Sequence, residues 1–329
     1  NEEKHIRACI ESCVQIAEAI SAEVLFVDSY STDHTLAIAR EYPIRIVRLR
    51  KNWFISLAAG RNTGAMKGHG KYVWFIDGDM TAKMEFAAAA LRFLDDHPSA
   101  AGVMGIVEDL VPFDQGTLLS YGGEAMPEFS KDRPSPLRYI MGGGFFRREA
   151  VLAAGGYFPY MTGEAEVEMS RRLRCNGWML YYLPVVAVTH HGRSATYWKE
   201  VSRRVRRNLY AGLGVHFILG IRSPLRHEII ERCWKFLVAM CQTIATAILL
   251  ILSFIYGEWL MAGIAAIGEL VSLTANIAVK RNVRFGFRAY ITQKIIGFCM
   301  LKGMAMGLKK YPPYPTDVEI VPTCGEAKR

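Results

Sequence analysis

Two long apolar stretches in the second half of the chain constrain its fold more than any other feature. FLVAMCQTIATAILLILSFIY, residues 236–256, contains no charged residue, and residues 259–279 contain only Glu269. Each has the length of roughly 20 residues that an α-helix needs to cross a bilayer. Only Gly257 and Glu258 separate them, so we expect a transmembrane helical hairpin. The alternative, a hairpin buried in a soluble protein, is less favoured because so small a domain cannot easily bury both stretches.

Basic residues flank both outer ends of this hairpin. Residues 196–235 combine aromatic and aliphatic residues with four clustered arginines, Arg203, Arg204, Arg206 and Arg207. The segment KRNVRFGFR directly follows the second apolar stretch. Because positively charged segments stay on the cytoplasmic side of membranes, we expect a multi-pass protein of the cell inner (plasma) membrane, with its first half in the cytoplasm.

The four arginines are expected to face the membrane interface, because anionic headgroups attract basic segments next to a span. A solvated helix face is the alternative. Residues 290–310 contain Lys294 and Lys302, so we expect this segment to lie in the interface as an amphipathic helix instead of spanning.

The first half of the chain alternates between strand and helix patterns. EVLFVD and YVWFI are apolar strand runs. MEFAAAALRFLDDHP, which follows the second of these runs, has apolar residues at helical spacing. Such alternation predicts an α/β domain with a mostly parallel sheet. We therefore divide the chain into an α/β domain, basic amphipathic interface helices, the hairpin, and a basic loop with an interfacial helix and C-terminal tail, at 1–195, 196–235, 236–279 and 280–329.

Composition narrows the class of protein. The chain has 329 residues, is 51% apolar and 22% charged, and this balance excludes a disordered chain. Its net charge of +9 suits nucleic acid, an anionic membrane or a phosphate-bearing substrate. The arginines cluster beside the apolar stretches, which favours lipid headgroups, and we expect no nucleic-acid partner. The seven cysteines lack metal-ligand spacing and indicate reduced thiols.

The stretch YVWFIDGDM, residues 72–80, places two carboxylates directly after a strand. Asp77 and Asp79 would repel each other unless a cation joined them. Mg²⁺ or Mn²⁺ with oxygen ligands typically brings substrate phosphates with it, and Gly78 allows the backbone to approach a ligand closely. A metal-diphosphate site is one interpretation, and a simple turn is the other.

Five segments in order resemble one known family. VDSYSTDHT (27–35), AAGRNTGA (58–65), FIDGDM, GGGFFRREAVLAAGGY (142–157) and GEAEVEMSRRLRCNGW (163–178) closely resemble family 2 glycosyltransferases with the GT-A (Rossmann-like) fold, over roughly residues 1–192. Among these, the membrane-anchored bacterial transferases that act on lipid-linked acceptors are the most similar. NEE at residues 1–3 matches the turn after that family's first strand, so we expect a strand upstream.

The resemblance implies roles on the donor side. Asp28 would contact the nucleotide base or ribose, and Arg61 would reach the nucleotide. Asp77 would hold the ribose or metal side of the site, and Asp79 would bind the metal, Mn²⁺ or Mg²⁺. His190 and His191 follow a strand run and are candidates for contact with the diphosphate or metal, with a structural role as the alternative.

On the acceptor side, Glu166 lies where the family has its catalytic acid. The expected Glu-Asp pair reads Ala165-Glu166 here, with Glu164 one residue earlier, so the base is open between Glu166 and Glu164. Acids at the start of a helix also suit its dipole.

The resemblance implies an inverting, metal-dependent transfer from a UDP- or GDP-sugar. A hydroxyl acceptor needs a base, and the acids at 163–168 favour the hydroxyl of a polyprenyl-diphosphate-linked saccharide, in cell-surface polysaccharide or glycolipid synthesis. Polyprenyl phosphate is the alternative acceptor, and a catalytically inactive membrane scaffold is less favoured because Asp77 and Asp79 are present. The QxxRW motif of processive synthases is absent. The oligomeric state is open.

Overall fold

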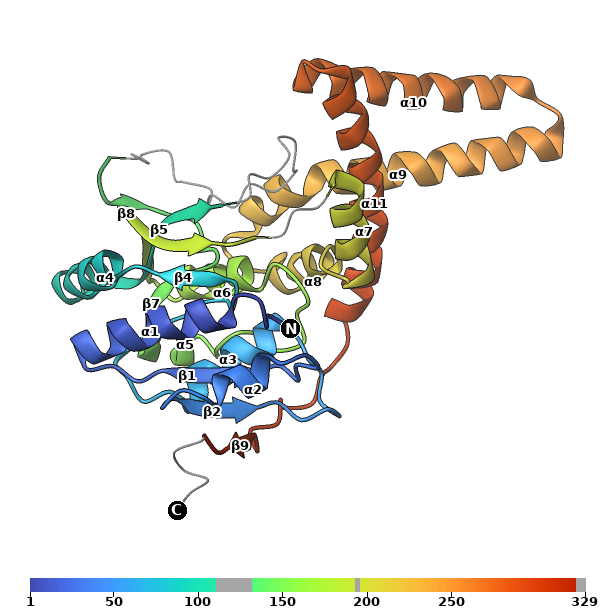
Figure 1. Ribbon diagram of the computed structural model, residues 1–329. Helices are drawn as coiled ribbons and strands as arrows, with labels where there is room; N and C mark the ends of the chain where they lie inside the picture. Colours follow the sequence, from blue (N-terminus) through green and yellow to red (C-terminus); the bar gives the residue numbers. More distant parts are fainter. Residues whose placement is uncertain (111–131, 193–195, 324–329) are drawn as a thin grey trace. The chain divides into compact units, whose positions relative to one another are not determined.

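The computed structural model describes residues 1–110, 132–192 and 196–323, which form two compact units (Figure 1). The first unit comprises residues 1–110, 132–192 and 311–323 of the described chain, and the second comprises 196–310. The second unit therefore interrupts the first in sequence, and the chain returns to the first unit at its C-terminal end.

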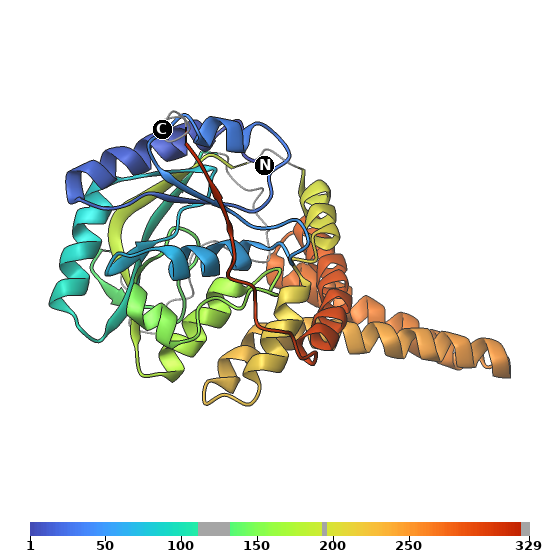
Figure 2. The ribbon, with the colours of Figure 1, turned by 90° about the horizontal axis from the view of Figure 1, so that it is seen from below.

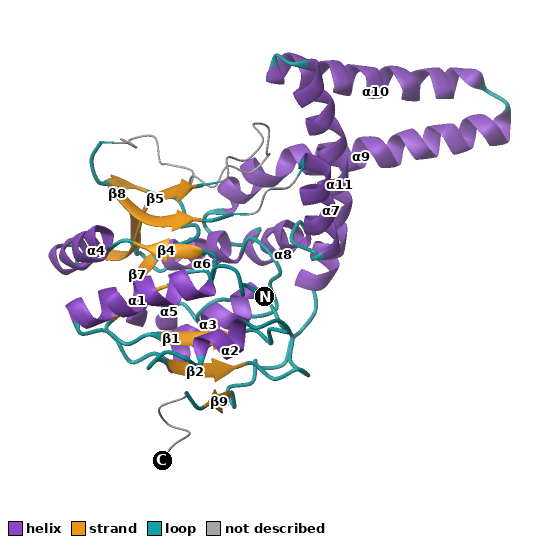
Figure 3. Ribbon diagram, viewed as in Figure 1, coloured by secondary structure: helices purple, strands orange, loops and turns teal. Residues whose placement is uncertain are grey.

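Helices and strands alternate through the first unit (Figure 3). In chain order they are α1 (Ile6–Ile20), β1 (Leu25–Asp28), α2 (Thr35–Ala39), β2 (Arg45–Arg48), α3 (Leu57–Lys67), β3 (Tyr72–Trp74), β4 (Met80–Ala82), α4 (Met84–Asp96), β5 (Ala100–Asp109), β6 (Ser135–Pro136), β7 (Phe145–Arg147), α5 (Arg148–Ala153), α6 (Ala165–Cys175), β8 (Met179–His190) and β9 (Glu319–Val321).

These strands form two sheets, one of order β3-β7-β5-β8-β4 with β6 beside β8, and one of order β1-β2-β9. The α/β class is confirmed. The pairing is mixed instead of mostly parallel: β1/β2 and β5/β8 are parallel, and the other described pairs are antiparallel. The sequence pattern does not report strand direction, because that depends on which distant strand each one pairs with, such as β3 with β7 and β4 with β8.

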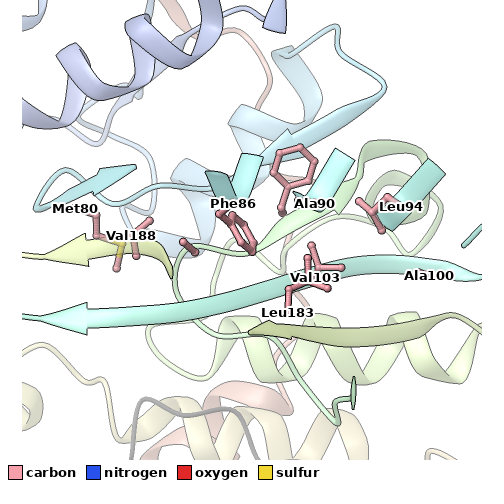
Figure 4. Close-up of a cluster of buried hydrophobic side chains, with 10 residues drawn as sticks. Met80, Phe86, Ala90, Leu94, Ala100, Val103, Leu183 and Val188 are labelled. Atoms are coloured by element: carbon pink, nitrogen blue, oxygen red, sulfur yellow. The ribbon is translucent and has the colours of Figure 1, made fainter. Parts of the chain in front are cut away.

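Helix α4 packs on β5 and β8 in the buried hydrophobic cluster shown in Figure 4. Phe86, Ala90 and Leu94 recur at helical spacing on one face of α4 and are fully buried. They meet Val103 of β5 and Val188 of β8. This packing fixes the two parallel strands side by side, and so fixes the positions of the residues at their carboxyl ends.

The C-terminal segment of the first unit returns to the sheet. Its strand β9 pairs antiparallel with β2, with Ile46 opposite Val321. Before β9, the Tyr160 and Tyr311 rings stack with centroids 4.3 Å apart, and the Tyr314 hydroxyl donates to the carbonyl oxygen of Phe54 at 2.8 Å. The tail is therefore an integral part of this unit's packing.

The second unit is helical. Its helices are α7 (Tyr197–Arg206), α8 (Ala211–Gly220), α9 (Arg226–Tyr256), α10 (Trp259–Lys280) and α11 (Val283–Gly307). The basic segment expected as a loop after residue 279 is instead the first turns of α11. Asn282 explains this, because its side chain caps the helix by accepting a hydrogen bond from the Phe285 backbone N–H at 3.0 Å.

Among the helices that the structure describes, α9 and α10 are the two that are long and apolar enough to cross a membrane, with mean hydropathies of 2.2 and 1.6. Few of their side chains are buried. Phe254 is 90% exposed and Trp259 is 84% exposed. A buried hairpin in the core of a soluble protein does not fit this exposure.

Candidate active site

The ends of three strands bring the central residues of the site together. Asp109 and His190 are register partners at the ends of the parallel strands β5 and β8. Met80, the first residue of β4, also pairs with His190, so the preceding residue, Asp79, lies beside the same imidazole. Ligand sites of α/β sheets commonly form at such strand ends.

His190 lies between two carboxylates. Its Nδ1 is 2.6 Å from Asp109 Oδ1, and its Nε2 is 3.5 Å from Asp79 Oδ2. The hydrogen bond with Asp79 raises the pKa of His190 to about 9, with Asp109 adding to this and partial burial opposing it. His190 therefore carries a proton at neutral pH when only these carboxylates surround it.

His191 has a different setting from its neighbour. Its backbone N–H donates to the Asp79 carbonyl oxygen at 2.8 Å, and its ring stacks on His5 with centroids 5.2 Å apart. Its Nε2 lies 3.5 Å from Thr81 Oγ1. These contacts support the turn that carries Asp79, and a direct ligand contact by His191 stays a prediction.

Arg61, on α3, bridges two carboxylates that are distant in sequence. Its guanidinium donates to Glu166 Oε1 at 2.5 Å and to the Asp77 oxygens at 2.9 and 3.1 Å. The side chain is 7% exposed. Burial disfavours its charge, but Asp77 and Glu166 together raise the pKa of Arg61. Burial likewise raises the pKa of the Asp77 carboxyl, although Arg61 opposes this.

The Asp77-Gly78-Asp79 turn joins these two sets of contacts into one site. The site contains four carboxylates, those of Asp77, Asp79, Asp109 and Glu166. In the contacts described above they pair with one guanidinium, of Arg61, and one imidazole, of His190. Even with the imidazole protonated, negative charge is in excess. Like-charge repulsion of this kind is relieved by a bound cation.

The three acids at the start of α6 have different environments. Glu168 is 2% exposed and pairs with Arg171 at 3.1 Å and Arg172 at 2.7 Å, so its role is structural. Glu166 contacts Arg61. Glu164 is the N-cap of α6 and has φ of 62°, a left-handed conformation that is strained for a residue other than glycine. Such strain commonly marks functional positions, so Glu164 and Glu166 both stay candidates for the base.

Asp28 lies at the end of β1, with a fully buried side chain. Its carboxylate accepts hydrogen bonds from the Ser31 backbone N–H at 3.0 Å and from Arg48 Nε at 2.8 Å. The Arg48 guanidinium lies 4.3 Å from the centroid of the Tyr30 ring. Asp28 therefore shapes the loop after β1, and its expected nucleotide contact stays a prediction.

The arginines expected at the membrane interface belong to the second unit and divide into two pairs. Arg203 and Arg204 both donate to Glu200, at distances of 2.6 to 2.8 Å. Arg206 and Arg207 are exposed. The second pair is the more exposed of the two, and contact of any of the four arginines with lipid is untested.

Asp109 was not among the residues singled out from the sequence, yet it makes the shortest contact with His190. Its signal was available, because AGVMGIVED ends an apolar strand in an acid just as EVLFVD and YVWFID do. The pairing of β5 with β8 was the missing information, since only this register places Asp109 opposite His190.

The donor set suits a divalent cation that also binds substrate. Asp79 offers oxygen and His190 offers nitrogen, a mixture that transition ions such as Mn²⁺ accept. Asp109 would orient the imidazole, as outer carboxylates do for metal-binding histidines. Within the described residues no group of three or more acidic, histidine or cysteine side chains forms a complete metal site. Substrate oxygens would therefore have to complete the coordination.

One protein family matches the first part of the chain. Residues 1–153 match the family described as glycosyl transferase family 2. The chain carries a family 2 glycosyltransferase domain. No curated protein matches the sequence.

Solved structures show the same fold as this glycosyltransferase. S. aureus TarS 1–349 in complex with UDP-GlcNAc has a TM-score of 0.53 and 13% identity, covering 99% of this chain and 95% of that one. The longer S. aureus TarS chain has a TM-score of 0.51 and 17% identity over 70% of this chain, which covers only 40% of TarS. The mannosyltransferase PcManGT from Pyrobaculum calidifontis, in complex with GDP-Man and Mn²⁺, has a TM-score of 0.56 and 19% identity over 93% of this chain and 84% of its own. The fold is therefore GT-A, as expected.

Proposed function

We propose that this glycosyltransferase uses a UDP- or GDP-sugar and a divalent cation to glycosylate a lipid-linked acceptor with inversion. The observation that carries the proposal is the joined site, in which the Asp77-Gly78-Asp79 turn links the Arg61 bridge to the carboxylates around His190. One end of this turn suits a metal diphosphate, and the other suits a hydroxyl that must lose a proton.

Asp79 and His190 would hold the cation, either Mn²⁺ or Mg²⁺. When bound, it would neutralise negative charge on the leaving diphosphate. PcManGT with GDP-Man and Mn²⁺ and TarS with UDP-GlcNAc support the use of a nucleotide-sugar donor. The His190 imidazole supports Mn²⁺ more than Mg²⁺, because magnesium prefers oxygen ligands.

Glu166 and Glu164 are the proposed proton acceptors for the attacking hydroxyl. Arg61 holds Glu166 in a fixed position, because the guanidinium donates to it at 2.5 Å. Glu164 is the N-cap of α6, and its left-handed backbone directs the first turn of that helix. Arg61 is thereby proposed as a positioning residue, and its expected contact with the nucleotide stays a prediction.

The acceptor is proposed to be a polyprenyl-diphosphate-linked saccharide at the cytoplasmic face of the inner membrane, in the synthesis of a surface polysaccharide or glycolipid. The exposed apolar helices α9 and α10 support the membrane location, and the acids on α6 support a hydroxyl over a lipid phosphate, which is already anionic and needs no base.

The test is nucleotide release by the detergent-purified chain with UDP- and GDP-sugars and Mn²⁺. We expect release to require a polyprenyl-diphosphate-linked saccharide and to be lost in Asp79→Asn. Asp96→Asn, at an exposed position on α4, is the matched control and should keep full activity. Release with polyprenyl phosphate alone would exclude the hydroxyl acceptor, and equal release by Asp79→Asn would exclude the metal site. No release with any donor would favour an inactive scaffold.

A further inference from the structure

A polar cluster joins the three long helices of the second unit. Glu269, near the middle of α10, accepts hydrogen bonds from Lys294 Nζ at 2.7 Å, from Thr246 Oγ1 at 2.8 Å and from the Tyr290 hydroxyl. Lys294 also donates to Thr243 Oγ1 at 2.9 Å. Glu269 and Lys294 thus form an ion pair. The cluster holds α9, α10 and α11 together at one position along the length of the hairpin.

The hairpin has a different composition on the two sides of this cluster. Towards the tip, residues 247–256 and 259–268 contain no charged residue, and the Ser253 hydroxyl donates to the Glu258 carbonyl oxygen. Large apolar side chains are exposed all around these two segments, including Ile251, Leu260 and Ile264. Away from the tip, α10 carries several polar side chains, Ser272, Thr274 and Asn276. Only the tip half is uniformly suited to hydrocarbon.

Charged residues of the second unit lie at the level of the cluster. The Tyr197 hydroxyl, at the start of α7, is 2.7 Å from Thr292 Oγ1 of α11, two residues before Lys294. The Arg288 guanidinium lies 4.7 Å from the Tyr197 ring centroid, and Lys199 is exposed. Figures 1 and 2 show α11 running across α9 and α10 instead of alongside them. Helix α7 and the basic α11 therefore lie about as far from the tip of the hairpin as the Glu269 cluster does.

These contacts distinguish between two depths at which the hairpin could lie in a bilayer. If α10 crossed the bilayer, Glu269 would lie at its centre and would carry Arg288, Lys199 and the rest of α7 with it. Each charged residue at the centre costs roughly 2.5–3.5 kcal/mol on insertion scales. If the cluster instead lies among the headgroups, Glu258 at the tip is the one charged residue of residues 247–268 that enters hydrocarbon.

We propose that the α9–α10 hairpin enters only one leaflet, with the Glu269–Lys294 pair at the headgroup level and α7 and α11 lying along the membrane surface. The ten residues 247–256, and likewise the ten residues 259–268, extend about 15 Å at 1.5 Å per residue. This is half of the roughly 30 Å hydrocarbon core. The chain would thus be anchored from one side without crossing, which rests on the membrane association proposed above.

The test compares the depths of three exposed positions on the hairpin. Single-cysteine additions at Val279, Ile267 and Tyr256, all more than 60% exposed, are spin-labelled in the full chain. The chain is then reconstituted in vesicles of phosphatidylethanolamine and phosphatidylglycerol. Relative accessibility to oxygen and to a water-soluble nickel chelate reports the depth of each label. The parent chain, labelled in the same way, gives the background from the native cysteines.

We expect depth to increase from position 279 through 267 to 256, with the tip protected from nickel. A deeper label at 267 than at 256 would show that the hairpin crosses, and would overturn this inference while leaving membrane association intact. Nickel access at all three positions would instead overturn membrane association itself. Transfer activity is not needed for either outcome, so a failure of the proposed reaction is distinguishable from a failure of this placement.

Discussion

Replacing Asp109 with asparagine tests the arrangement around His190 without touching a proposed metal ligand. With aspartate at this position, His190 Nδ1–H donates to Oδ1 at 2.6 Å, so a cation that displaces the Nε2 proton meets an imidazole that is already oriented. An asparagine amide can donate to Nδ1 instead, which moves the imidazole proton to Nε2. The substitution therefore removes the preference for the metal-binding tautomer.

We expect Asp109→Asn to weaken Mn²⁺ binding by about 10- to 100-fold, the usual effect of losing an outer-shell carboxylate. At about 1.4 kcal/mol per factor of ten, this corresponds to about 1.4–2.8 kcal/mol. The assay is calorimetric titration of the detergent-purified chain with Mn²⁺ at a saturating concentration of UDP. Because it measures affinity, it does not depend on turnover.

Glu108→Gln is the matched control for this experiment. Glu108 is the preceding residue of β5 and accepts a hydrogen bond from Thr189 Oγ1 at 3.2 Å, beside but not within the His190 contacts. Its substitution should leave the Mn²⁺ affinity unchanged. If Asp109→Asn binds Mn²⁺ as tightly as the parent, with an unchanged melting temperature, Asp109 does not orient the imidazole and the reasoning is wrong.

Three further substitutions test other contacts. Arg61→Met should lower the free energy of unfolding by about 3–5 kcal/mol in denaturant titrations, because it leaves two carboxylates without their buried partner; a loss below 1 kcal/mol would contradict the bridge. Gly303→Ala should lower the melting temperature in detergent, because its Cβ would lie 1.8 Å from a backbone oxygen of α8. Gly263→Ala is the control and should leave the melting temperature unchanged, because no atom lies within 4 Å of its Cβ. Equal effects of the two substitutions would refute the contact between α8 and α11. Tyr314→Phe should cost about 0.5–1.5 kcal/mol of unfolding free energy through its lost hydrogen bond to the Phe54 carbonyl, and an unchanged value would show that the tail contributes little there.

The fold class and the order of the site segments could be read from the sequence because they depend on local patterns. The strand run before Asp77 and the helical spacing of Phe86, Ala90 and Leu94 are such patterns, and both are found in the structure. The mixed pairing could not be read, because a strand's partner depends on contacts between distant segments. The pairing of β9 with β2, across more than 250 residues, carries no local signal.

The same limit applies within the site. Asp79 and Glu166 were singled out by their local setting, but the sequence does not reveal that Arg61 joins Asp77 to Glu166. It gives no sign that Asp28 pairs with Arg48, or that Asp109, at the end of its strand run, lies opposite His190. Each of these facts depends on which side chains the tertiary structure places opposite one another, and periodicity carries no information about that.

The position of β9 has a consequence for how the polypeptide matures. A ribosome makes residues 1–192 before the apolar helices, and residues 311–323 after them. Until residues 319–321 emerge, β2 lacks its β9 partner and presents an open backbone edge, and such edges are templates for pairing with other chains. The β1-β2-β9 sheet therefore forms only after the hairpin has left the ribosome, so synthesis of the apolar helices precedes completion of this sheet.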